Sequence, residues 1–266
     1  MFAAGARAET GIVTLVEGSP RLLRGATWYK LVAATRVEEA DIVEAPDRAQ
    51  AQIELAAGSV ANLVGAGKLH FVPRQAKSPL PLLNMPAGWL KVVAKAPGVR
   101  VRTLPFDLVI VEGIAVVRAD GATIEVFVES GSAKLIELAP SGADGPGRDI
   151  KSGEYVARSA TGALSSSQRP PKSFVDALPR HFVDPLPTLA AKIKPKPSLA
   201  VDRDITYAEA EPWLAGRDRA LFEKRFAGRL RDPAFRAAAL PNLARYPSWD
   251  RMLHPEKYAP KAEPVK

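Results

Sequence analysis

The feature that most constrains the fold of this chain is an alternation of apolar and polar side chains between Gly11 and Phe71. The clearest example is the alternation of Ala49, Ala51, Ile53 and Leu55 with Arg48, Gln50, Gln52 and Glu54. A period of two indicates a strand with one buried face. Short apolar runs of this kind recur between Gly, Pro and Asp residues. The stretch therefore predicts about five strands of an all-β sandwich, barrel or solenoid.

The alternation also predicts which side chains face the core. Ile53 falls on the apolar face and should be buried, whereas Gln52 falls on the opposite face and should contact solvent. Glu44 and Glu54 are expected on the solvent-exposed faces of neighbouring strands, where charged side chains normally lie. A glycosidase would need two carboxylates facing each other across a cleft. We predict no such pair among Asp41, Glu44, Asp47 and Glu54.

A second β segment follows a proline-rich connection. Residues 73–86 contain four prolines, which a central strand does not tolerate, so we expect an extended loop between two halves, residues 11–72 and 87–158. Turns are expected at Gly121, at Gly131 and over residues 141–147. Strands are expected at Trp89–Val93, Val99–Thr103, Phe106–Val111, Ile114–Arg118, Ile124–Val128, Lys134–Leu138 and Glu154–Arg158.

Residues 159–205 are expected to contain a linker and a proline-rich strap. Residues 159–168 are small and polar, as in a linker, and residues 169–197, which we call the strap, hold seven prolines. This density disfavours regular helix and sheet and favours an extended chain. The strap also carries more apolar residues than a free linker does. We therefore predict that it lies along a surface of the β domain.

A small helical module is predicted over residues 206–258. Thr206 and Glu209 form a capping box, and Asp232 followed by Pro233 forms a second helix start. Ser248 is expected to cap a last helical turn. Leu221, Phe222, Phe226 and Leu230 fall at helical spacing between these signals. Residues 259–266 are expected to be a disordered end.

The β segment resembles the periplasmic domain of the ferric-citrate regulator (FecR) family over residues 11–158. The first half of the pattern is matched by Gly11-Ile12-Val13, Glu17-Gly18, Arg24, Asp41-Ile42-Val43-Glu44, Arg48 and Leu55-Ala56-Ala57-Gly58-Ser59. The second half is matched by Val99-Arg100-Val101-Arg102-Thr103, Glu112-Gly113, Val128-Glu129-Ser130-Gly131 and Ser152-Gly153-Glu154. Ala40 and Ala57 depart from the pattern, since the family favours Gly and Asp there. The resemblance implies a FecR-type β domain.

The resemblance also implies a role in signalling. Members of that family relay signals across the inner membrane through an N-terminal cytoplasmic anti-sigma part and one membrane helix. The β segment of this chain begins near residue 11, and no apolar run approaches the roughly 20 residues of a membrane helix. We therefore expect a periplasmic scaffold or signal-relay module with a protein partner, rather than sigma-factor regulation by this chain alone.

Residues 1–10, MFAAGARAET, are expected to be either the remnant of a signal peptide or a disordered Ala-rich end. Ala6-Arg7-Ala8 has the A-x-A form of a signal-peptidase site, although the apolar region that normally precedes such a site would lie upstream of this chain. Together with the FecR resemblance, this predicts an exported protein whose mature chain starts near Glu9.

The sequence predicts neither an enzyme nor a metal or cofactor site. It has no cysteine, which excludes disulfides and thiolate ligands. The three histidines, His70, His181 and His254, are far apart and lack ligand spacing. The run Gly65-Ala66-Gly67-Lys68 departs from the phosphate-binding P-loop pattern and is predicted to be a turn between strands.

The basic charge of the C-terminal residues does not predict a nucleic-acid partner, and its simplest interpretation is a solvated basic tail. Residues 169–266 hold 19 Lys and Arg against 12 Asp and Glu, a balance of +7, but no nucleic-acid-binding motif. Short helices must pack on something, and aromatic and Arg side chains are common interface anchors. We expect the strap to pack on the β domain and the helical module to contact the partner. The predicted partner-binding residues are Trp213, Phe222, Phe226, Arg229, Phe235, Tyr246 and Trp249.

The alternative hypothesis is that the chain binds peptidoglycan or another carbohydrate of the envelope. It rests on an aromatic platform that Trp28, Tyr29 and Trp89 could form on one β face. Aromatic residues beside a Gly-rich turn also commonly lie at the edge of a core, so both interpretations remain open at this stage.

Overall fold

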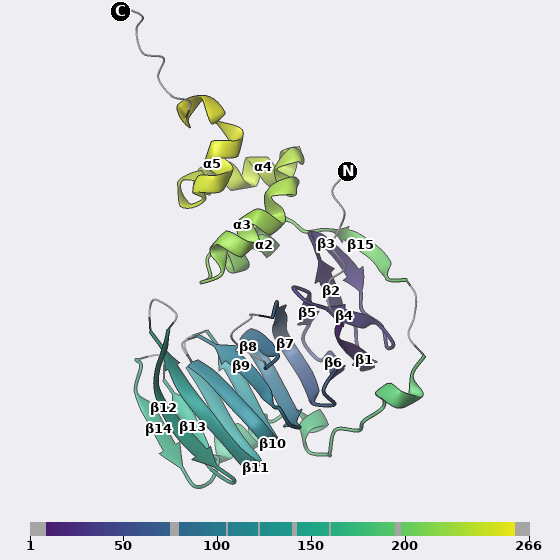
Figure 1. Ribbon diagram of the computed structural model, residues 1–266, viewed down its shortest axis with the longest axis vertical. Coiled ribbons are helices and arrows are strands. Elements are labelled where there is room, and N and C mark those ends of the chain that lie inside the picture. Colours follow the sequence, from purple (N-terminus) through teal and green to yellow (C-terminus); the bar gives the residue numbers. More distant parts are fainter. Residues whose placement is uncertain are drawn as a thin grey trace, which may run out of the picture. The chain divides into compact units, whose positions relative to one another are not determined.

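The computed structural model describes residues 9–74, 80–104, 106–121, 123–139, 143–159, 161–194 and 198–258 (Figure 1). The predicted signal-peptide remnant, apart from Glu9 and Thr10, and the predicted disordered end at 259–266 lie outside these residues. The chain divides into two compact units. The first unit comprises Met1–Arg24 and Tyr29–Val201, and the second comprises Gly25–Trp28 and Asp202–Lys266.

The predicted fold class, a mainly β chain with a small helical region at its C-terminal end, is confirmed. Before residue 73 the chain forms more than the five strands that we predicted: β1 (Glu9–Glu17), β2 (Arg21–Arg24), β3 (Thr27–Lys30), β4 (Arg36–Glu38), β5 (Ile42–Ala45), β6 (Gln50–Leu55) and β7 (Val60–Val72). It continues with β8 (Leu82–Ala94), β9 (Val99–Thr103), β10 (Phe106–Asp120), β11 (Thr123–Leu138), β12 (Asp144–Lys151), β13 (Tyr155–Arg158) and β14 (Leu164–Ser167).

The strands of the first unit belong to one large mixed sheet. Its main path runs β14–β13–β11–β10–β9–β8–β7–β5–β2, and β1, β4, β6 and β12 pair beside that path. Most pairs are antiparallel, but β8 and β9 are parallel. The long strands β8, β10 and β11 lie side by side (Figure 1). The buried core is formed by apolar residues of these strands, and Ile53 is fully buried, as predicted.

β10 and β11 each replace two shorter strands of the prediction. Register shifts between Ile110 and Glu112 and between Ile114 and Ala115 bend the pair without ending it. Gly113 and Gly131 face each other within this region, both with positive φ, and a Cβ on Gly131 would lie 2.2 Å from the Glu112 carbonyl oxygen. Only glycine fits so close an approach, so the glycine that we interpreted as a turn lies inside a long hairpin.

The prediction of a loop through residue 86 is wrong, because β8 begins at Leu82 and includes Pro86. The pairing of β7 with β8 shifts register between Lys68, which faces Ala87, and His70, which faces Asn84. Proline is tolerated at such an irregularity, where its missing N–H breaks no regular ladder. The predicted turn at 141–147 also ends early, since β12 starts at Asp144.

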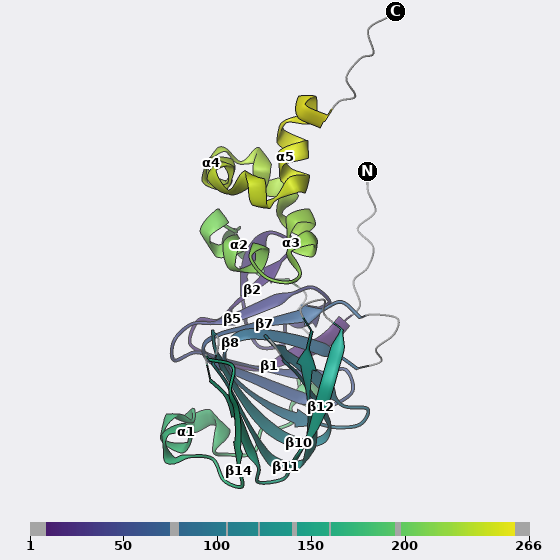
Figure 2. The same ribbon diagram turned by 90° about the vertical axis from the view of Figure 1, so that its left-hand side faces the viewer.

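The region predicted to be linker and strap contains more regular structure than expected. β14 lies within the predicted linker, and the strap contains α1 (Lys172–Ala177) and the short 3-10 helices η1 (Arg180–Phe182) and η2 (Ala190–Lys192). α1 forms because Pro170 and Pro171 precede it and Pro179 follows it, where proline disturbs no helical hydrogen bond. Figure 2 shows α1 beside the strands of the first unit.

The helical unit follows β15 (Ala200–Asp204). It comprises α2 (Tyr207–Leu214), α3 (Arg219–Phe226), η3 (Ala227–Arg231), α4 (Pro233–Ala239), η4 (Leu240–Arg245), α5 (Pro247–Leu253) and η5 (Pro255–Tyr258). Two predicted helix starts are confirmed, the capping box of Thr206 and Glu209 and the Asp232 cap before Pro233. The predicted Ser248 cap is wrong, since Ser248 lies inside α5 and donates a hydrogen bond to Glu223.

Candidate functional site

A row of polar side chains crosses three strands of the first unit. Gln52 of β6 faces Asn62 of β7, which in turn faces Lys91 of β8. These three residues, which we call the polar row, are buried, and Gln52 is only 1% exposed. The prediction that Gln52 contacts solvent is therefore wrong. β6 is buried on both faces, because another part of the chain covers the face that the alternation assigned to water.

The strap contacts the two outer residues of the polar row, Gln52 and Lys91. Gln52 Nε2 donates to the Pro187 carbonyl at 2.9 Å and to Thr14 Oγ1 at 2.8 Å. Lys91 Nζ donates to the Phe182 carbonyl at 2.5 Å. An extended, proline-rich chain has no regular backbone partners of its own, and here side chains of the sheet supply them.

Two glutamates complete this set of contacts, one bound to the strap and one to Lys91. One carboxylate oxygen of Glu54 accepts hydrogen bonds from the backbone N–H groups of Leu189 and Ala190, the latter at 2.9 Å. Lys91, which is 3% exposed, also forms an ion pair with Glu129 at 3.0 Å. All of these contacts to the strap reach its backbone, at Phe182, Pro187, Leu189 and Ala190.

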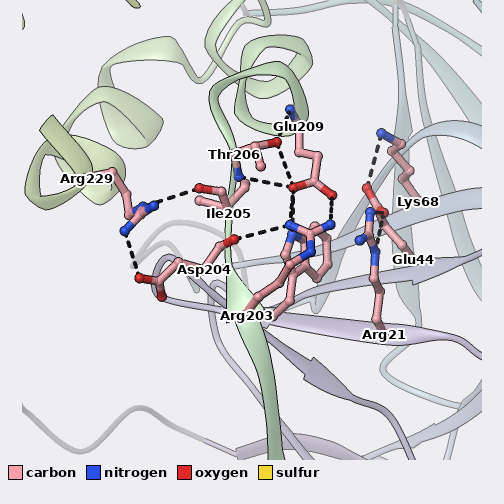
Figure 3. Close-up of polar contacts among 10 residues, drawn as sticks. Arg21, Glu44, Lys68, Arg203, Asp204, Ile205, Thr206, Glu209 and Arg229 are labelled. Carbon is pink, nitrogen blue, oxygen red and sulfur yellow. Dashed lines mark hydrogen bonds and ion pairs between the residues drawn. The ribbon is translucent and has the colours of Figure 1, made fainter. Parts of the chain in front are cut away.

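The two glutamates predicted to face solvent on neighbouring strands are also corrected. Glu54 is buried below the strap, and Glu44 is buried on β5, where Arg21 and Lys68 hold its carboxylate at 2.8 and 3.1 Å (Figure 3). β5 and β6 do not pair with each other, since each pairs with a different part of β7. Each carboxylate is bound by groups of the chain itself, which indicates a structural role. The two carboxylates therefore do not form a catalytic pair.

Aromatic side chains fix the beginning of the strap. Phe174 and Phe182 are buried, and the ring centroid of Phe174 lies 5.2 Å from those of Trp89 and Tyr155. The Tyr155 hydroxyl donates to Glu125 at 2.5 Å. Burial, and next the hydrogen bond to Glu125, raise the pKa of Tyr155 well above its usual value, so this phenol stays neutral.

A cavity of about 310 Å³ borders Trp89, where the middle of β7 and of β8 meets the end of β10. Arg118 lies 5.1 Å from the centre of the Trp89 ring and donates to Glu125 at 3.0 Å. The cavity is lined by Asp47, Gly65, Ala66, Ala87, Gly88, Trp89, Arg118, Ala119 and Asp120. It combines small side chains, one aromatic ring and three charged groups.

The aromatic residues predicted to bind a partner form the core of the helical unit. Trp213 packs on Phe222, and Phe222 stacks on Phe226. Trp249 packs on Phe235 and on Tyr246, with centroids 6.0 and 4.9 Å apart. All six of these rings are buried in the core of the helical unit, and their contact with a partner stays a prediction. The physical reason for the burial is that a unit this small needs its large aromatic side chains to build a core.

Arg229, the seventh predicted residue, is part of a polar network at the start of α2. Its guanidinium binds Asp204 at 2.7 Å and the Ile205 carbonyl at 3.3 Å (Figure 3). In the same network Glu209 receives two hydrogen bonds from Arg203, both at 2.7 Å, and completes the capping box. These contacts give Arg229 a structural role.

The predicted platform of Trp28, Tyr29 and Trp89 does not form a single exposed surface. Trp28 is fully buried in the second unit, and its indole N–H donates to Glu209 at 3.4 Å. Tyr29 packs against the core of the first unit. Of the three, Trp89 alone lines the cavity described above.

Each histidine has surroundings of its own. His70 is fully buried, His181 lies 3.7 Å from Glu17, and His254 Nδ1 lies 2.7 Å from Asp250. Among the described residues, no group of His, Cys, Asp or Glu is arranged to hold a metal ion. None of the helices in the described ranges has the length and apolar character that crossing a membrane requires.

Comparisons with known proteins give limited similarity. No family model matches the sequence, and no curated protein matches it. Two crystal structures of a “putative anti-sigma factor” from Parabacteroides distasonis resemble part of the fold, at 17% and 16% identity, each with a TM-score of 0.41. Each match covers 48% of this chain and 59% of the matched chain, and at this level it supports no statement about function.

Proposed function

We propose that this chain is a non-enzymatic protein of the cell envelope, exported to the periplasm, that binds another protein as a scaffold or signal-relay module. The resemblance of residues 11–158 to the FecR family supports the compartment and the signalling role. The strap, held through its backbone, supports a structural purpose for the buried polar groups of the sheet.

The observation that carries the proposal is a set of exposed side chains at the end of the helical unit. Met252 and Tyr258 are 55% and 46% exposed. Arg251 lies over the Tyr258 ring, 5.3 Å from its centre. Met, Tyr and Arg are enriched in protein interfaces, where they combine apolar contact with directed hydrogen bonds. We therefore place the partner contact on Arg251, Met252 and Tyr258 rather than on the buried aromatic core.

A crosslinking experiment in the native cells tests this surface. The full chain should crosslink to a discrete partner, and changing Arg251, Met252 and Tyr258 together to Ala should abolish the product. The matched control is Val175→Ala with Val183→Ala, which removes two exposed apolar side chains of the strap and should leave the product intact. A product that survives the triple change would contradict our placement of the contact.

The compartment is tested separately by fractionation and N-terminal sequencing. A periplasmic protein whose mature chain begins near Glu9 is expected. A cytoplasmic protein that retains Met1 would refute export, while the crosslinking result would still decide the question of the binding surface.

A further inference from the structure

The cavity beside Trp89 is built on an irregular part of the sheet that the proposed function does not use. The pairing of β7 with β8 shifts register between Val64 and Lys68, and Gly65 and Gly88 have φ values of +59° and +107°. A Cβ on Gly88 would lie only 2.3 Å from the Gly67 Cα, so the two strands can approach only through glycine. Bulges of this kind are over-represented beside binding and active sites.

The walls of the cavity leave room for one small ring. Ala66 and Ala87 contribute only methyl groups, and Trp89 supplies a half-buried aromatic side chain. The volume of about 310 Å³ lies at the lower end of the range of ligand cavities, which is about 300–1,000 Å³. It suits a single small ring better than a large ligand.

Three charged groups meet at this cavity. Asp47 and Asp120 are exposed, and Asp47 pairs only loosely with Arg48, at 3.8 Å. Arg118 is held by the Trp89 ring and by Glu125. Its position is therefore fixed before any ligand arrives, which reduces the entropy lost on binding.

The charges select among the classes of ligand. Two carboxylates disfavour an anion such as a phosphate or an acidic sugar, because like charges repel. An organic cation would find the face of the Trp89 ring already occupied by Arg118, so the ring offers it no cation–π contact. The remaining class is a neutral molecule whose groups both donate and accept hydrogen bonds, and the hydroxyl groups of a sugar do both.

We propose that this cavity binds a neutral sugar ring, with its hydroxyl groups on Asp47, Asp120 and Arg118 and its apolar carbons against the alanine side chains and the edge of Trp89. This inference stands on the cavity alone and does not depend on the proposed protein partner. In this proposed site Trp89 acts together with Arg118 and two aspartates, whereas the platform predicted from the sequence combined it with Trp28 and Tyr29.

Titration of the full chain with N-acetylglucosamine and with its trimer tests the proposal. The Trp89 indole N–H resonance should shift in NMR spectra, and calorimetry should give a saturable isotherm. Asp120→Ala should weaken binding about tenfold or more, since it removes a hydrogen bond to a charged group. Ala66→Phe should abolish binding by filling the cavity, without removing any polar group.

The matched control is Asp184→Asn, an exposed carboxylate on the strap, which should bind as the wild-type chain does. Spermidine and glucuronate test the cationic and acidic classes. The proposal is overturned if neither saccharide binds, if binding survives both Asp120→Ala and Ala66→Phe, or if spermidine or glucuronate binds and the neutral sugars do not.

Discussion

At the scale of single residues, Ala40 occupies a backbone conformation that suits glycine. Its φ is +67°, in the left-handed region, where a Cβ costs roughly 1 kcal/mol. Ala40 is also one of the two positions at which the sequence departs from the FecR pattern, which favours Gly there. We predict that Ala40→Gly raises the free energy of unfolding by about 0.5–1 kcal/mol, as measured by urea denaturation.

The control for this change is Ala51→Gly, at a buried position of β6 that lies in extended backbone. There glycine gains no relief of strain and loses buried methyl contact, so stability should fall. Destabilisation by both changes would show that the left-handed backbone at residue 40 is not strained.

Gln52 shows how a buried polar residue can look exposed in the sequence. Gln52→Asp removes an amide that donates to Thr14 and to Pro187, and it places a carboxylate beside a carbonyl oxygen. We predict a loss of about 2–4 kcal/mol in the free energy of unfolding, because a charge is buried and the donor to the Pro187 carbonyl is lost. Gln168→Asp, at an exposed position, should change stability by less than about 0.5 kcal/mol in the same denaturation assay. Similar results for the two variants would mean that the strap does not cover Gln52 in solution.

At the scale of elements, the sequence predicted features that depend on neighbouring residues better than features that depend on strand pairing. The starts of α2 and α4 could be predicted from the sequence, because a cap and its partner lie within three residues of each other. The continuation of β8 through Pro86 could not be predicted, because this proline is tolerated only at a register shift in the pairing with β7. The burial of Gln52 depends on Pro187, 135 residues further along the chain, and no local pattern carries that information. The aromatic residues of the helical unit were recognised as important, but the sequence could not distinguish a core from an interface.

The end of the helical unit should be sensitive to acid. Asp250 accepts hydrogen bonds from Tyr258 and Lys257 and contacts His254, and these groups lower the pKa of Asp250 to about 2, the Tyr258 bond being the largest cause. A depressed carboxyl pKa contributes stability that is present above the unfolded value, near 4, and is lost as pH falls toward 2. We predict that η5 detaches from α5 between about pH 4 and pH 2.

The measurement is an NMR titration of the Asp250 carboxyl carbon together with the Tyr258 ring resonances. Both should change together, with a midpoint near pH 2. In Asp250→Asn the Tyr258 signals should no longer follow that titration. A midpoint near 4 would show that Asp250 is not bonded to Tyr258 in solution.

At the scale of the whole molecule, the chain divides into two units, and this affects how truncated chains can be compared. A truncation is informative only when it is compared with a second truncation that lacks the same unit. The second unit includes Gly25–Trp28, and Trp28 donates to Glu209, so any chain that ends before residue 202 loses these contacts. Comparing a truncated chain with the full chain therefore mixes two effects. Chains 1–201 and 1–168 both lack residues 202–266 of the second unit, and they differ only in the strap and the four residues that follow it.

We predict that 1–201 is more stable than 1–168 by several kcal/mol. Phe174 and Phe182 are each 1% exposed, and burying a Phe side chain is worth about 1.5–3 kcal/mol. Without the strap, Trp89 and Tyr155 lose their aromatic neighbour and the polar row loses its backbone partners. Thermal melting should show a lower midpoint for 1–168, and a dye that binds exposed apolar surface should fluoresce more strongly with it. Phe174→Ala in the 1–201 chain should reproduce part of both changes. If 1–168 and 1–201 melt at the same temperature and bind the dye equally, the strap does not stabilise the sheet, and the backbone contacts of Gln52, Glu54 and Lys91 do not persist in solution.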